Sequence, residues 1–164
     1  MSSESYAFSI AAAEQAQDLT VLINAAFAIE STIFSDERID LIGVLGHLQK
    51  GTFIVARRCN SADHKLVGCV YIESQNELGY FGLLSVAPSE QRHGLGAQLI
   101  SEAEDLCGKA GAKSMYIRTI NLRAELPPYY RKFGYSIIRE EFPEQGPSAI
   151  QPYHYVIMEK ELTR

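Results

Sequence analysis

Hydrophobic residues recur along this chain with two different spacings, which predict where helices and strands lie. Ala16, Leu19, Ile23 and Phe27 follow one another in steps of three or four residues, as on the buried face of an amphipathic helix. The most regular helix starts at Leu95, with apolar residues on one face and acidic residues elsewhere. The same criteria predict three further helices, over residues 14–29, 36–48 and 122–133.

Short apolar runs bounded by polar turns predict the strands. These runs cover residues 6–10, 52–56, 66–72, 80–86, 114–120, 135–139 and 153–158. The links between the second, third and fourth runs are short enough for antiparallel hairpins, and a strand–helix–strand crossover follows them. We therefore expect an α/β (α+β) protein with a mixed sheet and helices on its faces. Residues 140–152 contain three prolines and are predicted to form a loop.

Composition narrows the class of protein. The chain has 164 residues, 46% of them hydrophobic, which suits a single domain over residues 1–164 with a full-sized core. A net charge of −5 argues against a broad basic face for nucleic acid, but it leaves room for a local cationic pocket. Cys59, Cys69 and Cys107 share no metal-ligand spacing, and three cysteines are poor material for a disulfide framework.

The chain shows no targeting or membrane signal. Its first residues, MSSESYAFSI, lack the basic start and the long apolar stretch of a signal peptide. No window approaches 18 uninterrupted apolar residues, the length that a transmembrane helix needs. We expect a soluble, cytoplasmic protein that binds no membrane and no metal.

The segment with the clearest chemistry is QRHGLG, residues 91–96, which lies between a predicted strand and the helix that starts at Leu95. A helix N-terminus offers unpaired N–H groups and a partial positive charge, which suit a pyrophosphate. Gly94 and Gly96 let the backbone approach a phosphate closely, and Arg92 and His93 could add cationic donors. The segment lacks the Lys-Ser/Thr ending of a nucleotide P-loop and the three glycines of a dinucleotide fingerprint. A tight turn without any ligand is the alternative.

Two motifs together make the sequence resemble the GNAT superfamily of acyl-CoA-dependent N-acetyltransferases. Gln91, Gly94 and Gly96 match the pyrophosphate loop of that family. Asn121 after the next strand, and then YYRKFGY at residues 129–135, match its second motif. The resemblance implies a mostly antiparallel sheet of six to seven strands with about four helices, splayed between the fourth and fifth strands.

The resemblance also implies acetyl-CoA as co-substrate and a set of residues that bind it. The pantetheine arm would lie along the fourth strand and bond to the backbone of Leu84, Ser85 and Val86. The Leu84 N–H would donate to the acetyl carbonyl oxygen and act as an oxyanion donor. The remaining cofactor-binding residues would be Gln91, Arg92, His93, Gly94, Leu95, Gly96, Ala97, Asn121 and Tyr130.

Tyr130 matches the tyrosine that protonates the departing thiolate in this family. A phenol with a pKa near 10 is a suitable donor to a thiolate of similar basicity. Tyr129 is equally polar, but neighbouring helix positions point about 100° apart, so we expect only Tyr130 to face the cleft. The alternative is that Tyr130 only packs against other aromatic residues.

No general base can be identified from the sequence. Glu30, Glu73 and Glu77 could each take a proton from the acceptor, and His154 lies on the last predicted strand, but surface or structural roles are common for such residues. Some members of the family use a glutamate on the fourth strand, where this chain has Gly79, Tyr80 and Phe81. Of these groups, we take Glu30, Glu73 and His154 as candidates for contact with the acceptor.

Acidic residues are frequent in the segments that would surround the acceptor. An acidic rim would attract a cationic amine, although it would equally serve solubility. Arg38 and Arg139 partly offset it. The acidic residues are Glu30, Asp36, Glu37, Asp40, Glu140, Glu141 and Glu144.

These features predict an enzyme that acetylates the amine of a small molecule by direct attack of the amine on the thioester. Three alternatives stay open: an enzyme for protein or peptide amines, a catalytically silent acyl-CoA-binding module, and a phosphate-binding scaffold unrelated to coenzyme A. A homodimer also stays open, and we expect no nucleic acid partner.

Overall fold

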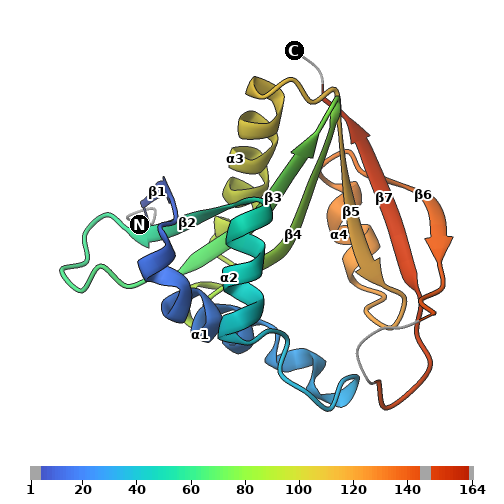
Figure 1. Cartoon of the computed structure of the whole chain (residues 1–164), viewed down its shortest axis with the longest axis horizontal. Helices are drawn as coiled ribbons and strands as arrows, with labels where there is room; N and C mark the ends of the chain where they lie inside the picture. The colour runs from blue at the N-terminus through green and yellow to red at the C-terminus, as the bar shows by residue number, and fades with distance from the viewer. Residues whose placement is uncertain (1–4, 145–148, 163–164) are drawn as a thin grey trace.

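The computed structural model describes residues 5–144 and 149–162 and contains one seven-stranded sheet (Figure 1). The strand order is β1-β2-β3-β4-β5-β7-β6, and every neighbouring pair is antiparallel except β4 and β5. The strands are β1 (Tyr6–Ile10), β2 (Thr52–Arg58), β3 (Gly68–Gln75), β4 (Leu78–Val86), β5 (Ser114–Ile120), β6 (Ser136–Glu141) and β7 (Tyr155–Glu161). The predicted mixed, mostly antiparallel sheet is confirmed.

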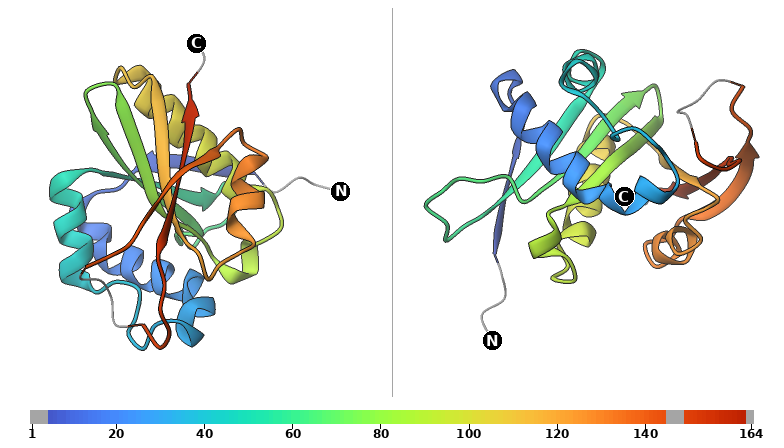
Figure 2. Two further views of the ribbon diagram at one scale, coloured as in Figure 1. Left: turned by 90° about the vertical axis from the view of Figure 1, so that its right-hand side faces the viewer. Right: turned by 90° about the horizontal axis from the view of Figure 1, so that it is seen from below.

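In the described part of the chain, four α-helices cover the two faces of the sheet (Figure 2). They are α1 (Ala16–Ala26), α2 (Leu41–Lys50), α3 (Leu95–Lys109) and α4 (Leu126–Arg131), with short 3-10 turns η1 (Ala13–Gln15), η2 (Ala28–Thr32) and η3 (Pro88–Glu90). Helices α1 and α2 pack on one face, where Leu19, Ile23 and Val44 meet Phe53 and Val55 of β2. Helix α3 packs on the other face together with Tyr130 of α4.

Three predicted helices are shorter in the structure, each for a local reason. The second begins at Leu41 instead of residue 36, because the Asp40 side chain caps it by accepting a 2.7 Å hydrogen bond from the Gly43 N–H. The last begins at Leu126, where two prolines occupy its first turn. The first gives way after Ala26 to η2, which carries Glu30.

The predicted loop at residues 140–152 is partly wrong, because Glu140 and Glu141 belong to strand β6. Residues 145–148 of this loop lie outside the described part of the chain. Past them, Ala149 forms an isolated bridge with Phe34, and the Ile150 N–H donates a 2.7 Å hydrogen bond to the Ile33 carbonyl. The segment before β7 is thereby joined to the segment between η2 and α2.

Candidate active site

Strands β4 and β5 diverge, and this opens the sheet (Figure 1). β5 pairs with β4 only from Leu78 to Tyr80, although β4 continues to Val86. Beyond Tyr80, the edge of β4 that faces β5 has no neighbouring strand in the described structure. An open strand edge presents backbone N–H and C=O groups that are ready to pair with an extended ligand.

A β-bulge in β4 lies on this open stretch. The pairing of β3 with β4 runs from Cys69 with Ser85 to Tyr71 with Gly82, so two residues of β4, Leu83 and Leu84, lie opposite one of β3. Leu83 has a φ of 51°, which is unusual for a bulky residue. The bulge redirects the backbone of Leu84 relative to regular β-sheet geometry.

Two buried side chains hold the bulge in place by bonding to the Leu83 carbonyl oxygen. The Ser85 hydroxyl donates to it at 2.9 Å and the Cys69 thiol donates at 3.8 Å. Burial raises the pKa of Cys69 to about 12, which keeps the thiol protonated and able to donate. No pattern in the sequence indicates this role of Cys69.

The loop between β4 and α3 is anchored at its start by Glu90. This residue is 1% exposed, accepts a 2.8 Å hydrogen bond from the Tyr6 hydroxyl, and forms an ion pair with Arg58. The loop is also tied to β4, because the Gln91 side-chain amide donates to the Val86 carbonyl oxygen at 3.3 Å. The position of the loop is therefore fixed relative to the sheet.

The turn into α3 uses two residues with left-handed backbone, Arg92 at φ 70° and Gly94 at φ 83°. A Cβ at Gly94 would meet no atom within 4 Å, so glycine is favoured there by the left-handed backbone and not by lack of space. Gly96 differs, because a Cβ there would lie 2.8 Å from the Tyr129 hydroxyl oxygen. The N-terminus of a 15-residue helix thus meets the open β4 edge with no side chain from Gly94 or Gly96 in between.

Tyr129 and Tyr130 of α4 both line the cleft, so our expectation that only Tyr130 would face it is wrong. Tyr130 is 8% exposed and packs against Phe81 and Tyr135 with ring centroids 6.0 and 6.3 Å away. Burial raises the pKa of Tyr130 and outweighs the opposing charge of Arg123. Within the described chain its hydroxyl makes no hydrogen bond, which leaves it able to donate to a ligand.

One continuous cleft of about 900 Å³ joins these features. Its loop end is formed by the bulge, the turn and the start of α3. Its polar end is formed by residues of the segment 24–38 together with Tyr80, Arg118, Arg123 and Tyr155. The predicted site residues that line the cleft are Glu30, Leu84, Val86, Gln91, Arg92, Gly94, Leu95, Gly96, Ala97 and Tyr130.

Five predicted site residues do not line the cleft: Ser85, which is buried beneath the bulge, the exposed His93, Glu73, Asn121 and His154. Asn121 and His154 instead bond to each other. The Asn121 side-chain oxygen accepts a 2.7 Å hydrogen bond from the His154 N–H, and the Asn121 N–H donates to the His154 carbonyl at 2.9 Å. The His154 ring stacks on Phe142 with centroids 4.7 Å apart. This pair joins the end of β5 to the segment before β7.

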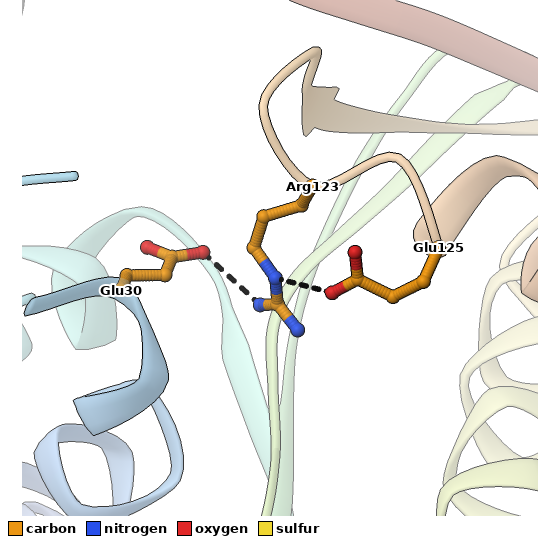
Figure 3. A network of polar contacts seen from close by, with 3 residues as sticks. All are labelled: Glu30, Arg123 and Glu125. Carbon is orange, nitrogen blue, oxygen red and sulfur yellow. Dashed lines mark hydrogen bonds and ion pairs between the residues drawn. The ribbon is translucent and has the colours of Figure 1, made fainter. Parts of the chain in front are cut away.

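An ion pair crosses the cleft at the polar end (Figure 3). Arg123, in the turn between β5 and α4, donates from Nη1 to Glu30 of η2 at 3.1 Å and from Nε to Glu125 at 2.9 Å. The Arg123 and Glu30 side chains are 17% and 9% exposed. This contact connects the two halves of the splayed sheet, and the sequence alone did not reveal it.

Comparison with known proteins identifies the family. A sequence model described as an acetyltransferase (GNAT) domain matches residues 44–157, more than half of the chain. The chain belongs to the GNAT family. As a GNAT protein it is an acyl-CoA N-acyltransferase. No curated protein sequence matches it.

Solved structures share this GNAT fold at low sequence identity. The ribosomal-protein-alanine N-acetyltransferase of Brucella melitensis has a TM-score of 0.75 at 15% identity, over 95% of this chain and 99% of that one. The yncA protein of Salmonella typhimurium, solved with its cofactor acetyl-CoA, has a TM-score of 0.73 at 15% identity, over 96% and 94%. Nourseothricin acetyltransferase has a TM-score of 0.72 at 16% identity, over 95% and 98%.

The polar end of this GNAT cleft is not the acidic rim that we expected. Asp36 and Glu37 line it, but Asp40 caps α2, and Glu140 and Glu141 pair with neighbouring His and Arg side chains. Among the residues that the structure describes, four carboxylates and four guanidinium groups line the cleft: Glu30, Asp36, Glu37 and Glu90, with Arg38, Arg92, Arg118 and Arg123.

Two further features concern the part of the GNAT chain that the structure describes. In residues 5–144 and 149–162, no helix is both long enough and apolar enough to cross a bilayer. The same residues contain no cluster of three or more His, Cys, Asp or Glu side chains that could hold a metal ion.

Proposed function

We propose that this protein transfers the acetyl group of acetyl-CoA to the amine of a small molecule. The observation that carries the proposal is the single cleft, which connects an open strand edge and a helix N-terminus at one end to charged side chains at the other. Tyr130 lines the same cleft, and its hydroxyl makes no hydrogen bond within the described residues, so it can donate to a ligand.

The loop end fits an acyl-CoA. The open β4 edge from Leu84 to Val86 offers backbone groups to an extended pantetheine arm, and the α3 N-terminus offers N–H groups to a pyrophosphate. The fit depends on Gly96, because a Cβ there would lie 2.8 Å from the Tyr129 hydroxyl oxygen, which belongs to a residue of the same cleft. We assign residues 91–97 to the pyrophosphate and assign no cofactor contact to the Asn121 side-chain oxygen, which is already bonded to His154.

Bound acetyl-CoA would supply an activated acyl group, and the chain's own residues would polarise it and move one proton. We assign the Leu84 N–H, displaced by the bulge, as donor to the acyl carbonyl oxygen. Tyr130 Oη holds the proton that passes to the departing sulfur, and burial keeps that phenol protonated.

No carboxylate is assigned as general base. Glu30 is the one predicted base candidate that lines the cleft, and its Oε1 is held by Arg123. A carboxylate fixed in an ion pair is poorly placed to accept a proton from an amine. We propose that the acceptor amine attacks in its neutral form, and that the proton it loses as the amide forms passes through solvent to restore the Tyr130 phenol.

The polar end favours a small acceptor over a protein. Phe34, which lines the cleft, forms a bridge with Ala149 and an edge-to-face contact with Tyr153 at 5.2 Å. These contacts hold the segment before β7 beside the polar end, which favours an acceptor of limited size. The similar proteins include both kinds, since one is named for nourseothricin and another for a ribosomal protein.

A screen of amines tests the proposal. Purified protein with acetyl-CoA is offered small amines, peptides with free N-termini and lysine peptides, and release of the CoA thiol is measured. We expect release with small amines and much less with peptides. Tight CoA binding without release above background for any amine would contradict the proposal and favour a silent acyl-CoA-binding module. Release with peptides alone would favour a protein acetyltransferase.

A further inference from the structure

Two arginines at the polar end of the cleft are each stacked on an aromatic ring. The Arg38 guanidinium lies over Phe27, 5.1 Å from the ring centroid, and the Arg118 guanidinium lies over Tyr155 at 5.0 Å. All four residues line the cleft. Arg38 and Phe27 come from the N-terminal half of the chain, and Arg118 and Tyr155 from β5 and β7, so the two pairs belong to different walls.

Stacking uses the face of a guanidinium group and leaves the N–H donors along its edge available. Arg38 has no carboxylate partner among the described residues. Arg118 forms an ion pair with Glu141, in which Arg118 Nη2 and Glu141 Oε2 are 3.5 Å apart. Planar donors held in this way are suited to a carboxylate, which accepts two parallel hydrogen bonds.

The charges of both guanidinium groups influence the pKa of one residue of the cleft, Tyr80. Its ring lies over Gly82 and 4.9 Å from the ring of Tyr116, and it lines the cleft. Burial raises the pKa of Tyr80, while the charges of Arg118 and Arg38 both oppose this rise. Both arginines line the same cleft as Tyr80, and we take them to act together on one bound group there.

The charge balance limits the type of acceptor. At the polar end, three carboxylates (Glu30, Asp36 and Glu37) face three guanidinium groups (Arg38, Arg118 and Arg123), although the chain as a whole carries −5. A polycationic amine would gain little there, because the arginines repel it. A molecule with one positive and one negative group matches this arrangement.

We propose that the acceptor is an amino acid or a similar amino carboxylate, whose carboxylate binds Arg38 and Arg118 while its amine points toward Leu84 and Tyr130. This inference rests on the proposed function and names the substrate class for the same site. Arg38 and Arg118 determine specificity and take no part in proton transfer.

The test compares three acceptors that differ only in the acidic group: phenylalanine, phenylalaninamide and phenethylamine. A phenyl group is chosen because Phe27, Phe34 and Tyr155 line the cleft. We expect kcat/KM for phenylalanine to exceed both others by at least about 10-fold, the usual range for charge-assisted hydrogen bonds. Arg118→Gln and Arg38→Gln should raise KM for phenylalanine by about 10-fold without raising KM for phenethylamine.

Arg57→Gln is the matched control, because Arg57 bonds to Ser9 and the His64 carbonyl and does not line the cleft. Equal kcat/KM for the three acceptors, or equal losses on all three in Arg118→Gln, would overturn the inference. Acetylation of amines that lack a carboxylate, with none of phenylalanine, would overturn the inference of a carboxylate site, while the proposed function would stand.

Calorimetry separates the inference from the proposed function if no amine releases thiol. N-acetylphenylalanine and its amide are titrated into the protein with CoA present. Preference for the acid that is lost in Arg118→Gln would support the carboxylate site. Equal binding of the two compounds, or no binding of either, would overturn it.

Discussion

The two ends of the cleft are built in different ways. The loop end is formed mainly by backbone: the β4 bulge at Leu83, the left-handed turn at Gly94 and the start of α3. The polar end is formed by side chains, among them Arg38, Arg118 and the Glu30–Arg123 pair. Backbone groups are common to every sequence that folds this way, whereas side chains can differ. The loop end therefore suits a co-substrate shared by the family, and the polar end suits an acceptor specific to this protein.

The largest expected effect is that of removing the proposed proton donor, Tyr130. Tyr130→Phe keeps the ring that packs on Phe81 and Tyr135 and removes the proton donor. We expect the acetyl transfer rate to fall about 10- to 1,000-fold, with little change in CoA affinity or melting temperature. Steady-state kinetics with an accepted amine measure the rate, CoA titration measures the affinity, and a thermal melt measures the melting temperature.

Tyr129→Phe is the control for this change. Tyr129 also lines the cleft, but its hydroxyl lies beside Gly96, at the loop end. The variant should lose far less rate than Tyr130→Phe. A larger loss in Tyr129→Phe, or none in Tyr130→Phe, would mean that the proton donor is wrongly assigned.

The second largest effect is expected on CoA affinity, from a substitution at the loop end. In Gly96→Ala the new Cβ would lie 2.8 Å from the Tyr129 hydroxyl oxygen, so the start of α3 or the Tyr129 side chain must shift. We expect CoA affinity to fall about 10-fold, because cores tolerate such overpacking poorly. Adding Tyr129→Phe removes the clashing oxygen and should restore most of the affinity. Failure of the double variant to recover would contradict this account of Gly96.

The third effect concerns the ion pair that joins the two halves at the polar end. Glu30→Gln leaves the Arg123 guanidinium without its buried partner, and we expect the free energy of unfolding to fall by about 1–3 kcal/mol. Urea unfolding without ligand measures this loss. Asp36→Asn is the control, since Asp36 is exposed and should change stability by less than about 0.5 kcal/mol. Equal stability of the two variants would show that the pair contributes nothing.

The smallest expected effect is the absence of a change with pH. Because burial raises the pKa of Tyr130, its phenol stays protonated at pH values where an exposed tyrosine, with a pKa near 10, begins to ionise. With saturating substrates, kcat should show no decline from about pH 8 to about pH 10. A decline in that range that is absent in Tyr130→Phe would show a phenol of ordinary pKa.

The sequence predicts the loop end better than the polar end, for a physical reason. The turn before α3 depends on a few consecutive residues, so Gly94 and Gly96 could be recognised from QRHGLG alone. The Glu30–Arg123 contact joins residues 93 positions apart, which no local pattern encodes. The bulge at Leu83 was equally hidden, because its supports, Cys69 and Ser85, resemble ordinary buried strand residues.

The bounds of helices and strands are likewise predicted well where they depend on consecutive residues. Strand β1 and strand β5 were predicted with their observed bounds, since alternation within one run defines them. The start of α2 was missed by five residues, because apolar spacing continues through Ile39 while the Asp40 cap decides where the helix begins. Asn121 was assigned to the cofactor by resemblance, and its contact with His154 depends on tertiary structure.

Amide hydrogen exchange with and without CoA tests the central claim most directly, because that claim concerns backbone groups. We expect CoA to protect the amides of residues 92–97 and of Leu84 and Val86 on the open edge of β4, with little change in β1 and β2. Protection confined to other parts of the sheet, or unchanged exchange at residues 92–97 with saturating CoA, would contradict the account.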